Sequence, residues 1–218
     1  MTKTGAAARP TLDLDEPDTL VEFLQYYKKP IIGGVIVAAA VLGGLWMWNR
    51  SVEIKEARAS AAYSSAENVY ASGNAPLAQP ELEQTVERYP GTAGGAQSAM
   101  LLARIHFEVD SFAAGVAVLE QALPKAPDAL EAGMLGLLGD GHESMGEHTQ
   151  AASAFERAAA ASDFDEERDR YRLAEARNRA AAGEVAQARA IYESIANRED
   201  SSYAGEAKVR LGELLGKA

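Results

Sequence analysis

One uninterrupted apolar stretch, residues 31–48, limits what this chain of 218 residues can fold into. Its 18 residues include no charged or strongly polar side chain. As a helix that rises about 1.5 Å per residue, the stretch covers most of a hydrocarbon core about 30 Å thick. Lys28 and Lys29 precede it, Arg50 follows it, and aromatic residues lie near both ends, as is typical of membrane interfaces. The sequence therefore predicts a transmembrane helix over residues 30–49.

Two other interpretations of this stretch are a cleaved signal peptide and a buried core helix. A signal peptide has a short basic start, an apolar centre of about 7–15 residues and small residues at the cleavage site. Here the preceding segment includes acidic residues such as Asp13 and Asp18, the apolar stretch is longer, and it ends in aromatic residues. We therefore favour a permanent anchor, with residues 1–29 as a tail and residues 50–218 as the main folded domain.

The charges that flank the stretch favour one orientation only slightly. Lys28 and Lys29 lie at one end, whereas Arg50, Lys55 and Arg58 lie near the other. Because Lys and Arg are enriched on the cytoplasmic side of membrane helices, we favour a cytoplasmic N-terminus.

Small residues recur four positions apart within the stretch, a spacing that lets two membrane helices approach closely. Such pairs also arise readily in any segment rich in alanine and glycine, so an anchor without a partner helix fits the sequence equally well. The candidate packing residues are Gly34, Ala38, Ala39, Gly43, Ala40 and Gly44.

The composition excludes several functions. Asp and Glu outnumber Lys and Arg by 32 to 21, and the whole net charge of −11 lies after residue 50. A surface this acidic repels nucleic acid, so we expect no nucleic-acid partner. The chain has no cysteine, which excludes disulfides, thiolate nucleophiles and cysteine metal sites.

Similar units follow one another in the second half of the chain. Residues 102–127 align with residues 138–163 at an offset of 36. Residues 174–200 align with the second of these units at an offset of 37, which pairs Tyr192 with Phe155. A period of this length indicates an array of helical repeats.

The repeat resembles the tetratricopeptide repeat, a helix-turn-helix unit of about 34 residues. Gly139 and Ala151 are small enough for paired helices to touch, and Phe155 is predicted to fill the space beside the neighbouring repeat. Gly146 and Gly183 fall between helices, where glycine adopts a positive φ at little cost. The sequence thus predicts an all-α fold, with a single N-terminal transmembrane helix followed by a tetratricopeptide-like α-solenoid of helical hairpins.

Two features are predicted to end helices in this array. Pro90 and Pro127 are placed to end two second helices, because proline cannot continue the hydrogen-bond ladder. Residues 201–218 are predicted to form a closing helix that covers the last repeat.

The order of segments resembles a known family. The segments that carry the resemblance are, in order, LVEFLQYYKKP, an anchor ending in LGGLWMWNR, the helical EARASAAYSSAENVY and the final SSYAGEAKVRLGELL. Through them the chain is similar to the tetratricopeptide-like family of single-pass ancillary subunits of the bacterial SecYEG translocon. The resemblance covers almost the whole chain, through loose motifs. It implies a bacterial inner-membrane protein with a periplasmic repeat domain that associates with the translocon and with periplasmic chaperones. The segment ERYPGTAGGAQSAMLLARIHF also resembles repeats of outer-membrane assembly and cell-division accessory proteins. The resemblance therefore indicates the class of protein more closely than it indicates the binding partner.

No motif predicts catalysis or a cofactor. His142 and His148 are six residues apart, and six residues turn a helix by about 600°, so the two rings do not share a face and packing or turn roles are favoured over metal binding. DLDEPD and DFDEERD lack the glycine and the closing glutamate of a calcium loop. GTAGGAQSA lacks the Lys-Ser/Thr of a phosphate loop. We therefore expect a protein that is not an enzyme.

The remaining candidate site is a groove. In arrays of tetratricopeptide repeats the first helix of each pair lines the concave face, and mixed charge with one aromatic suits an extended or helical peptide better than a small metabolite. The same positions are as consistent with ordinary exposed helix surface. The candidate groove residues are Arg104, Phe107, Asp140, Glu143 and Arg177.

Two functions fit these expectations. The first is a membrane-anchored adaptor that mediates protein–protein interactions at the inner membrane, as an ancillary subunit of the translocon or of the periplasmic chaperone network. The alternative is a structural accessory subunit of another membrane complex, respiratory or photosynthetic, docked through its transmembrane helix.

Overall fold

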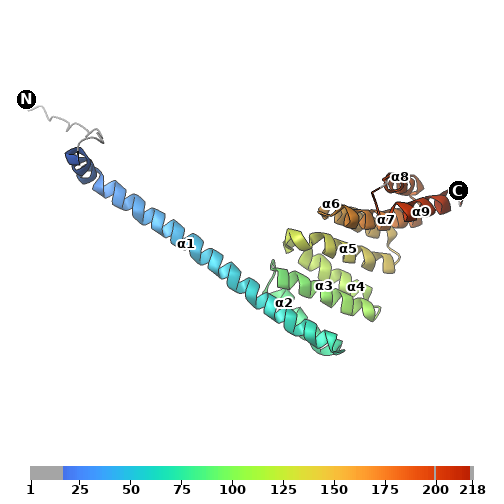
Figure 1. Ribbon diagram of the computed structural model, residues 1–218. Coiled ribbons are helices and arrows are strands. Elements are labelled where there is room, and N and C mark those ends of the chain that lie inside the picture. The colour runs from blue at the N-terminus through green and yellow to red at the C-terminus, as the bar shows by residue number, and fades with distance from the viewer. Residues whose placement is uncertain (1–16, 199, 217–218) are drawn as a thin grey trace, which may run out of the picture. The chain divides into compact units, whose positions relative to one another are not determined.

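The structure is a computed structural model that describes residues 17–198 and 200–216 (Figure 1). Within these residues the chain forms nine α-helices, one short 3-10 helix and no strand, so the predicted all-α fold is confirmed. The helices are α1 (Pro17–Ala71), α2 (Ala75–Arg88), α3 (Ala93–Glu108), α4 (Phe112–Ala122), η1 (Leu123–Lys125), α5 (Asp128–Ser144), α6 (His148–Ala161), α7 (Asp165–Ala181), α8 (Val185–Ala196) and α9 (Ala204–Gly216).

Helix α1 contributes to two compact units, residues 1–53 and residues 54–218. Its apolar part is long enough to cross a membrane, with a mean hydropathy of 1.6 over 18 residues, none of them buried. A core helix would bury such side chains, so the buried-core interpretation of the stretch does not fit the structure.

The predicted segment boundaries after residues 29 and 49 both fall inside α1 and stay a prediction. The first 16 residues of the predicted tail, Asp13 included, lie outside the described residues.

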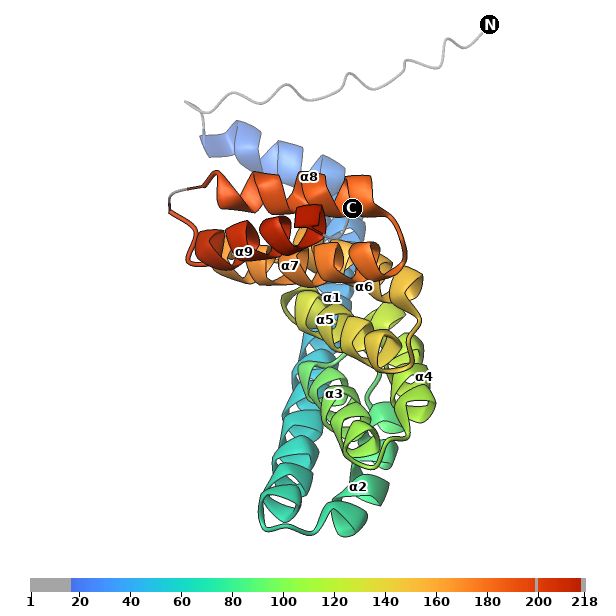
Figure 2. The same ribbon diagram turned by 90° about the vertical axis from the view of Figure 1, so that its right-hand side faces the viewer.

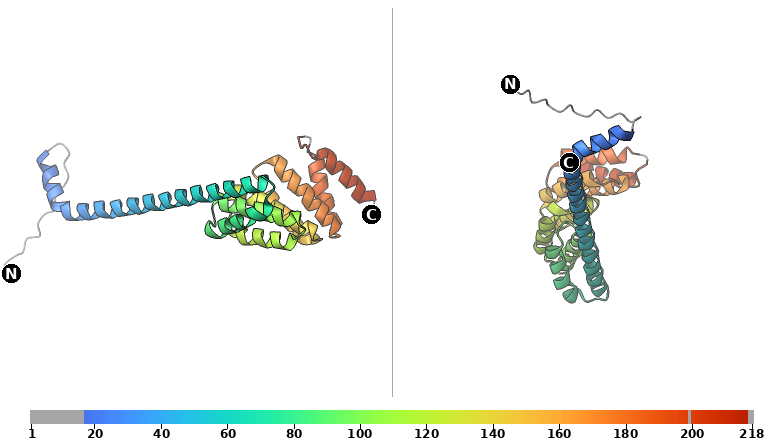
Figure 3. Two further views of the ribbon diagram at one scale, coloured as in Figure 1. Left: turned by 90° about the horizontal axis from the view of Figure 1, so that it is seen from below. Right: turned by 90° about the vertical axis from the view of Figure 1, so that its left-hand side faces the viewer.

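The second unit consists of helical hairpins stacked in chain order (Figures 2 and 3). Helix α3 packs against α2, α4 and α5, and α6 packs against both α5 and α7. Helices α7, α8 and α9 continue the same pattern. The predicted solenoid of hairpins is therefore confirmed.

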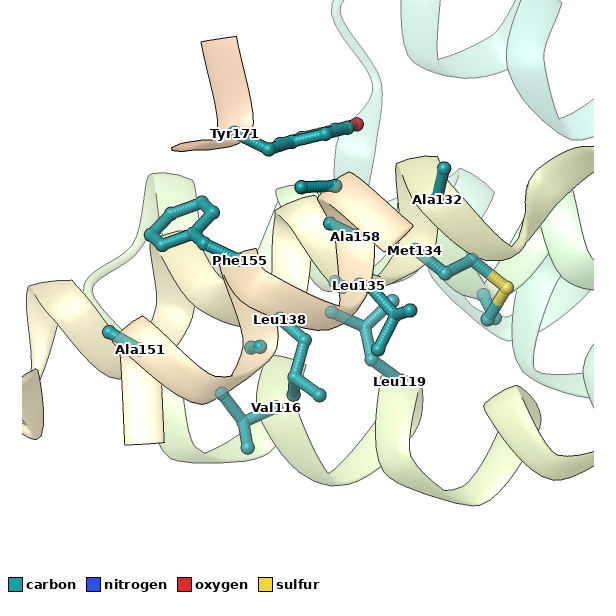
Figure 4. Packing of buried hydrophobic residues seen from close by; sticks show 14 of the residues in the cluster. Val116, Leu119, Ala132, Met134, Leu135, Leu138, Ala151, Phe155, Ala158 and Tyr171 are labelled. Atoms are coloured by element: carbon teal, nitrogen blue, oxygen red, sulfur yellow. The ribbon is translucent and has the colours of Figure 1, made fainter. Parts of the chain in front are cut away.

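The largest hydrophobic cluster joins α3 to α7 (Figure 4). Leu119, Leu135 and Phe155 are each at most 2% exposed, and burying a side chain of this size contributes about 1.5–3 kcal/mol. The Phe155 ring packs directly against Gly139: a Cβ added at residue 139 would lie only 2.8 Å from the ring, so only glycine leaves room for it. Ala151 is fully buried. Gly139 thus lets α5 and α6 pack closely, as predicted from its small size.

The start of α3 is fixed by a close contact with α1. A Cβ at Gly94 would lie 2.3 Å from the carbonyl carbon of Ala59, so the two backbones touch. The Glu56 carboxylate accepts hydrogen bonds from the backbone N–H of Ala93 at 3.1 Å and of Gly94 at 3.3 Å. A carboxylate at this position satisfies N–H groups that lack partners within the helix and complements the helix dipole. The contact continues into a cluster of Ala66, Ala78, Leu82, Leu101, Leu102 and Ile105.

The predicted closing helix is confirmed as α9. It packs on a cluster in which Tyr192 and Ile195 of α8 are almost fully buried. Ala207 is the buried contact of α9, whereas Val209 and Leu215 are exposed on its outer side.

Glycine and proline occupy most of the predicted turns. Gly146 and Gly183 adopt φ values of +76° and +84° between helices, and Pro90 follows the end of α2, as predicted. The prediction for Pro127 is wrong, because α4 ends five residues earlier and Pro127 caps the start of α5. Pro124, within η1, lacks the N–H that would continue the α4 ladder.

Candidate partner-binding groove

Three cavities follow one another along the second unit, and we call them together the groove. The N-terminal cavity, about 410 Å³, is lined by α1, α3 and α5, and the central cavity, about 420 Å³, mainly by α3, α5, α7 and the start of α9. The C-terminal cavity, about 310 Å³, is lined by α7, α8 and α9. Met100 and Arg104 line both of the first two cavities, and Arg177 lines both of the last two. The first helix of each hairpin thus builds the groove.

Two glycines of α5 keep the central cavity open. A Cβ at Gly136 would lie 2.4 Å from the Tyr171 ring, and one at Gly133 would lie 3.2 Å from the terminal methyl of Met100. A larger side chain at Gly136 would displace the Tyr171 ring, whereas one at Gly133 would press only on the flexible end of Met100. The glycines therefore provide both the close approach of α7 to α5 and the space beside it.

Tyrosine is the main aromatic residue of the groove. Of the eight tyrosines in the chain, five line the groove. Tyrosine is enriched where proteins bind proteins, because it offers a large, rigid ring with a polar end at low entropic cost. The five are Tyr63, Tyr70, Tyr171, Tyr192 and Tyr203.

The hydroxyls of Tyr63, Tyr70 and Tyr171 donate hydrogen bonds to carboxylates of the protein. Burial, together with a 2.7 Å hydrogen bond to Glu67, raises the pKa of Tyr63 to about 12. Burial also raises the pKa of Tyr171 to about 12, and its hydroxyl donates to Glu167 at 3.3 Å. Acceptors from the protein thus hold these rings in place.

Most charges in the groove are already paired. Arg177 donates two hydrogen bonds to the Glu143 carboxylate, at 2.9 and 2.7 Å. Desolvation alone would raise the pKa of Glu143, but this pairing lowers it. Arg170 lies 4.5 Å from the centre of the Tyr171 ring and 3.4 Å from Glu167. In the C-terminal cavity Arg210 pairs with Glu213 at 3.1 Å.

Arg104 and Asp140 differ from the other charged residues of the groove. Both are exposed in the central cavity, and neither side chain forms an ion pair or a hydrogen bond within the described residues. Loss of hydration in the hollow raises the pKa of Asp140, and the nearby Glu143 carboxylate adds to the rise. The positive charges of three nearby arginines lower the pKa of Asp140 by smaller amounts; they are Arg170, Arg177 and Arg104.

The structure brings together most of the residues proposed from the sequence. Arg104, Asp140 and Arg177 line the groove, and Glu143 lies beside it through its pair with Arg177. Phe107 lies elsewhere: a Cβ at Gly115 would be 2.4 Å from its ring and one at Gly141 would be 2.8 Å from it. The ring therefore packs between α3, α4 and α5, and the partner-binding role of the five residues stays a prediction.

Sequence reasoning missed the tyrosines. A signal for two of them was present, since Tyr63 and Tyr70 are seven residues apart and so lie on one face of a helix, two turns from each other. Tyr171, Tyr192 and Tyr203 come from different helices or their ends, and only the stack brings them to one surface.

The two histidines have separate partners. Nδ1 of His142 lies 2.7 Å from a Glu147 carboxylate oxygen, and Nδ1 of His148 lies 2.9 Å from the side-chain oxygen of Asn178. Among the described residues, no group of three or more His, Cys, Asp and Glu side chains is placed to hold a metal ion.

The small residues of the apolar stretch have no neighbour among the residues that the structure describes. Positions 34, 38–40, 43 and 44 are all exposed, and a Cβ at Gly34, Gly43 or Gly44 would meet nothing within 4 Å. Their role in packing against another membrane helix stays a prediction.

Comparison with known proteins places these features among helical repeats. Residues 22–135, just over half of the chain, match the family model of the tetratricopeptide repeat-like domain. The crystal structure of nearly identical TPR-like repeats, from a Podosopora anserina protein described as a kinesin light chain, superposes with a TM-score of 0.57 at 18% identity. The match covers 73% of this chain and 86% of that one, and a substituted form of the same protein matches equally well, with 85% of its chain covered. At this identity the likeness concerns the fold alone, and no match was found among curated proteins.

Proposed function

Since the chain belongs to the tetratricopeptide repeat-like domain family, we propose that it is a membrane-anchored, non-enzymatic adaptor whose groove binds a segment of a protein partner. The observation that supports this most is the groove itself, a series of three cavities of about 310–420 Å³ along the first helices. Solenoids of helical pairs use such extended concave surfaces to bind other proteins. The five tyrosines and the arginines of the groove belong to the residue types enriched in protein interfaces.

The apolar part of α1 supports the membrane anchor. Side chains such as Trp46 and Trp48 are 69% and 73% exposed, and no residue between 32 and 50 is buried. Exposed apolar surface of this extent is costly in water and marks contact with a membrane or another protein. A cleaved signal peptide is the competing interpretation of the same length and composition. Against it, α1 continues without a break from the apolar residues to Ala71.

The proposed location is the bacterial inner membrane, with the N-terminus in the cytoplasm and the repeat domain in the periplasm. The proposed partners are the SecYEG translocon and periplasmic chaperones, on the strength of the segment order described above. Tethering would confine the groove to the membrane plane, where a high local concentration makes weak contacts effective.

A second candidate function is that of a structural subunit in another membrane complex. The observation that favours it is the open surface around Gly34, Gly43 and Gly44, which leaves room for a neighbouring helix. In that case the apolar helix, rather than the groove, would provide the main contact.

Site-specific photocrosslinking in cells tests the proposed function. A photoreactive phenylalanine analogue replaces Arg170, which is exposed in the central cavity, and the matched control replaces Arg157, which is exposed on α6 outside all three cavities. Phe107 is unsuitable, because its ring packs against Gly115 and Gly141. The adaptor predicts a discrete crosslinked protein from position 170 and none from position 157. Equal crosslinking from both positions, or from neither, would contradict it.

Two further measurements separate the alternatives. Purification in mild detergent should recover SecY with an adaptor of the translocon, whereas a fixed place among cofactor-bearing subunits would favour the second function. Carbonate extraction tests the anchor: the chain should stay with the vesicles, and release into the supernatant would refute it.

A further inference from the structure

Arg104 and Asp140 are two charges of opposite sign in one cavity, and neither is paired within residues 17–198 and 200–216. We propose that they select the partner: the groove binds a protein segment in which a carboxylate contacts Arg104 and a Lys or Arg side chain contacts Asp140. This inference rests on the proposed function, because it specifies the occupant of the same groove.

The other charges of the groove are less available. Arg177 is held by both oxygens of Glu143, and Arg170 lies between Glu167 and the face of the Tyr171 ring. A partner would have to break these contacts before it gained new ones. Arg104 and Asp140 need only lose water.

The surroundings of Arg104 suit a carboxylate. It lies where the N-terminal and central cavities meet, beside Tyr63 and Tyr70 of α1. Glu67 and Glu108 already accept the hydroxyl hydrogens of these two tyrosines. A guanidinium offers five N–H donors in a planar fork that matches a carboxylate with two parallel hydrogen bonds. An incoming acidic side chain would therefore complete this part of the groove.

The surroundings of Asp140 suit a cation. Its carboxylate is partly dehydrated, and the neighbouring Glu143 adds unfavourable charge. Of the arginines near it, Arg177 is paired with Glu143 and Arg170 with Glu167, and Arg104 has the smallest effect of the three on Asp140. A Lys or Arg side chain of the partner would relieve both effects, because an opposite charge favours the ionised form of a dehydrated carboxylate.

The order of the two charges gives the bound segment a direction. Arg104 lies on α3 and also lines the N-terminal cavity, whereas Asp140 lies on α5 and lines the central cavity alone. The partner's carboxylate would thus lie toward α1 and its cation toward α7. The net charge of −11 disfavours uniformly acidic segments at long range, so a segment with both signs fits better than an acidic one.

The test uses the full chain in lipid nanodiscs and a phage library of random peptides, about 12 residues long, as the probe. The variants are Arg104→Glu and Asp140→Lys. Their matched controls reverse exposed charges outside the groove, Arg157→Glu on α6 and Asp163→Lys between α6 and α7. Circular dichroism first establishes that each variant unfolds at the temperature of the wild type.

The expected result is that wild-type chains enrich peptides with an acid and a base in a fixed order. A selected peptide should bind each groove variant at least about tenfold more weakly, and the controls within about twofold, because like charges in contact oppose binding. A variant that combines Arg104→Glu with Asp140→Lys should enrich peptides in which the acid and the base occur in the reverse order.

Two negative results have different meanings. Peptides that compete with the partner crosslinked from position 170, yet bind both variants like the wild type, would overturn the charge selection and leave the adaptor function intact. A library that yields no peptide bound in the groove, together with no crosslink from position 170, would contradict both.

Discussion

The contact between α1 and α3 makes Gly94→Ala the most informative single substitution. The added Cβ would lie 2.3 Å from the carbonyl carbon and 2.5 Å from the following backbone nitrogen of α1, at Ala59 and Ser60. Ordinary contact begins near 3.4 Å, so one helix must move by about 1.1 Å. Because both obstacles are backbone atoms, no side chain can rotate away. We therefore expect the whole start of α3 to shift.

The magnitude follows from two losses and one gain. Overpacking of a close contact costs about 1–3 kcal/mol. The shift also weakens the hydrogen bonds from Ala93 and Gly94 to the half-buried Glu56 carboxylate, each of which contributes about 1 kcal/mol after allowance for partial exposure. Alanine regains less than about 1 kcal/mol of helix propensity at the first turn. The expected net destabilisation is about 2–4 kcal/mol, which lowers Tm by roughly 5–12 °C in a chain of this size.

The assay is thermal and urea unfolding of the full chain, followed by circular dichroism at 222 nm. The matched control is Gly212→Ala on α9, where an added Cβ meets nothing within 4 Å. The same substitution should stabilise the protein there by about 0.5–1 kcal/mol, since alanine is the better helix former. A Gly94→Ala variant as stable as the wild type would refute the close backbone contact. If both substitutions destabilised the protein equally, contact with α1 would not be what decides whether Gly→Ala raises or lowers the free energy of unfolding.

Two further predictions concern a turn and an ion pair. Gly183→Ala should lower the free energy of unfolding, measured in urea, by about 1–2 kcal/mol, because a φ of +84° strains any residue with a Cβ. The added atom itself would meet nothing within 4 Å. An unchanged urea midpoint would contradict the positive φ at this residue. For Glu143 the folded state has the lower pKa, so its pair with Arg177 stabilises the protein fully above the ordinary value of 4.5, and this contribution is lost as pH falls through the folded value. In Glu143→Gln the unfolding free energy should therefore fall less steeply with acid than in the wild type, and parallel pH curves would show that the pair contributes nothing.

The predicted site shows how far sequence alone can locate a surface. Alignment placed Arg104, Asp140 and Arg177 on first helices, and all three line the groove. Phe107 follows Arg104 by three residues, which turns a helix by about 300° and leaves its side chain about 60° from that of Arg104. That rotation is enough to direct the ring between α3, α4 and α5, where Gly115 and Gly141 make room for it. Whether a residue at this angle faces the groove or the next helix depends on how the helices cross.

The sequence by itself determined the features that repeat or persist along the chain. The 18-residue apolar stretch, the offset of 36–37 residues between repeats and the turn glycines, Gly146 and Gly183, are local patterns, and the helical period converts them directly into helices and hairpins. Only the tertiary structure decided the groove. Its tyrosines, together with Arg104 and Asp140, come from segments up to 140 residues apart, from Tyr63 to Tyr203. Their meeting depends on interhelical contacts such as Gly94 against Ala59, which no single segment encodes.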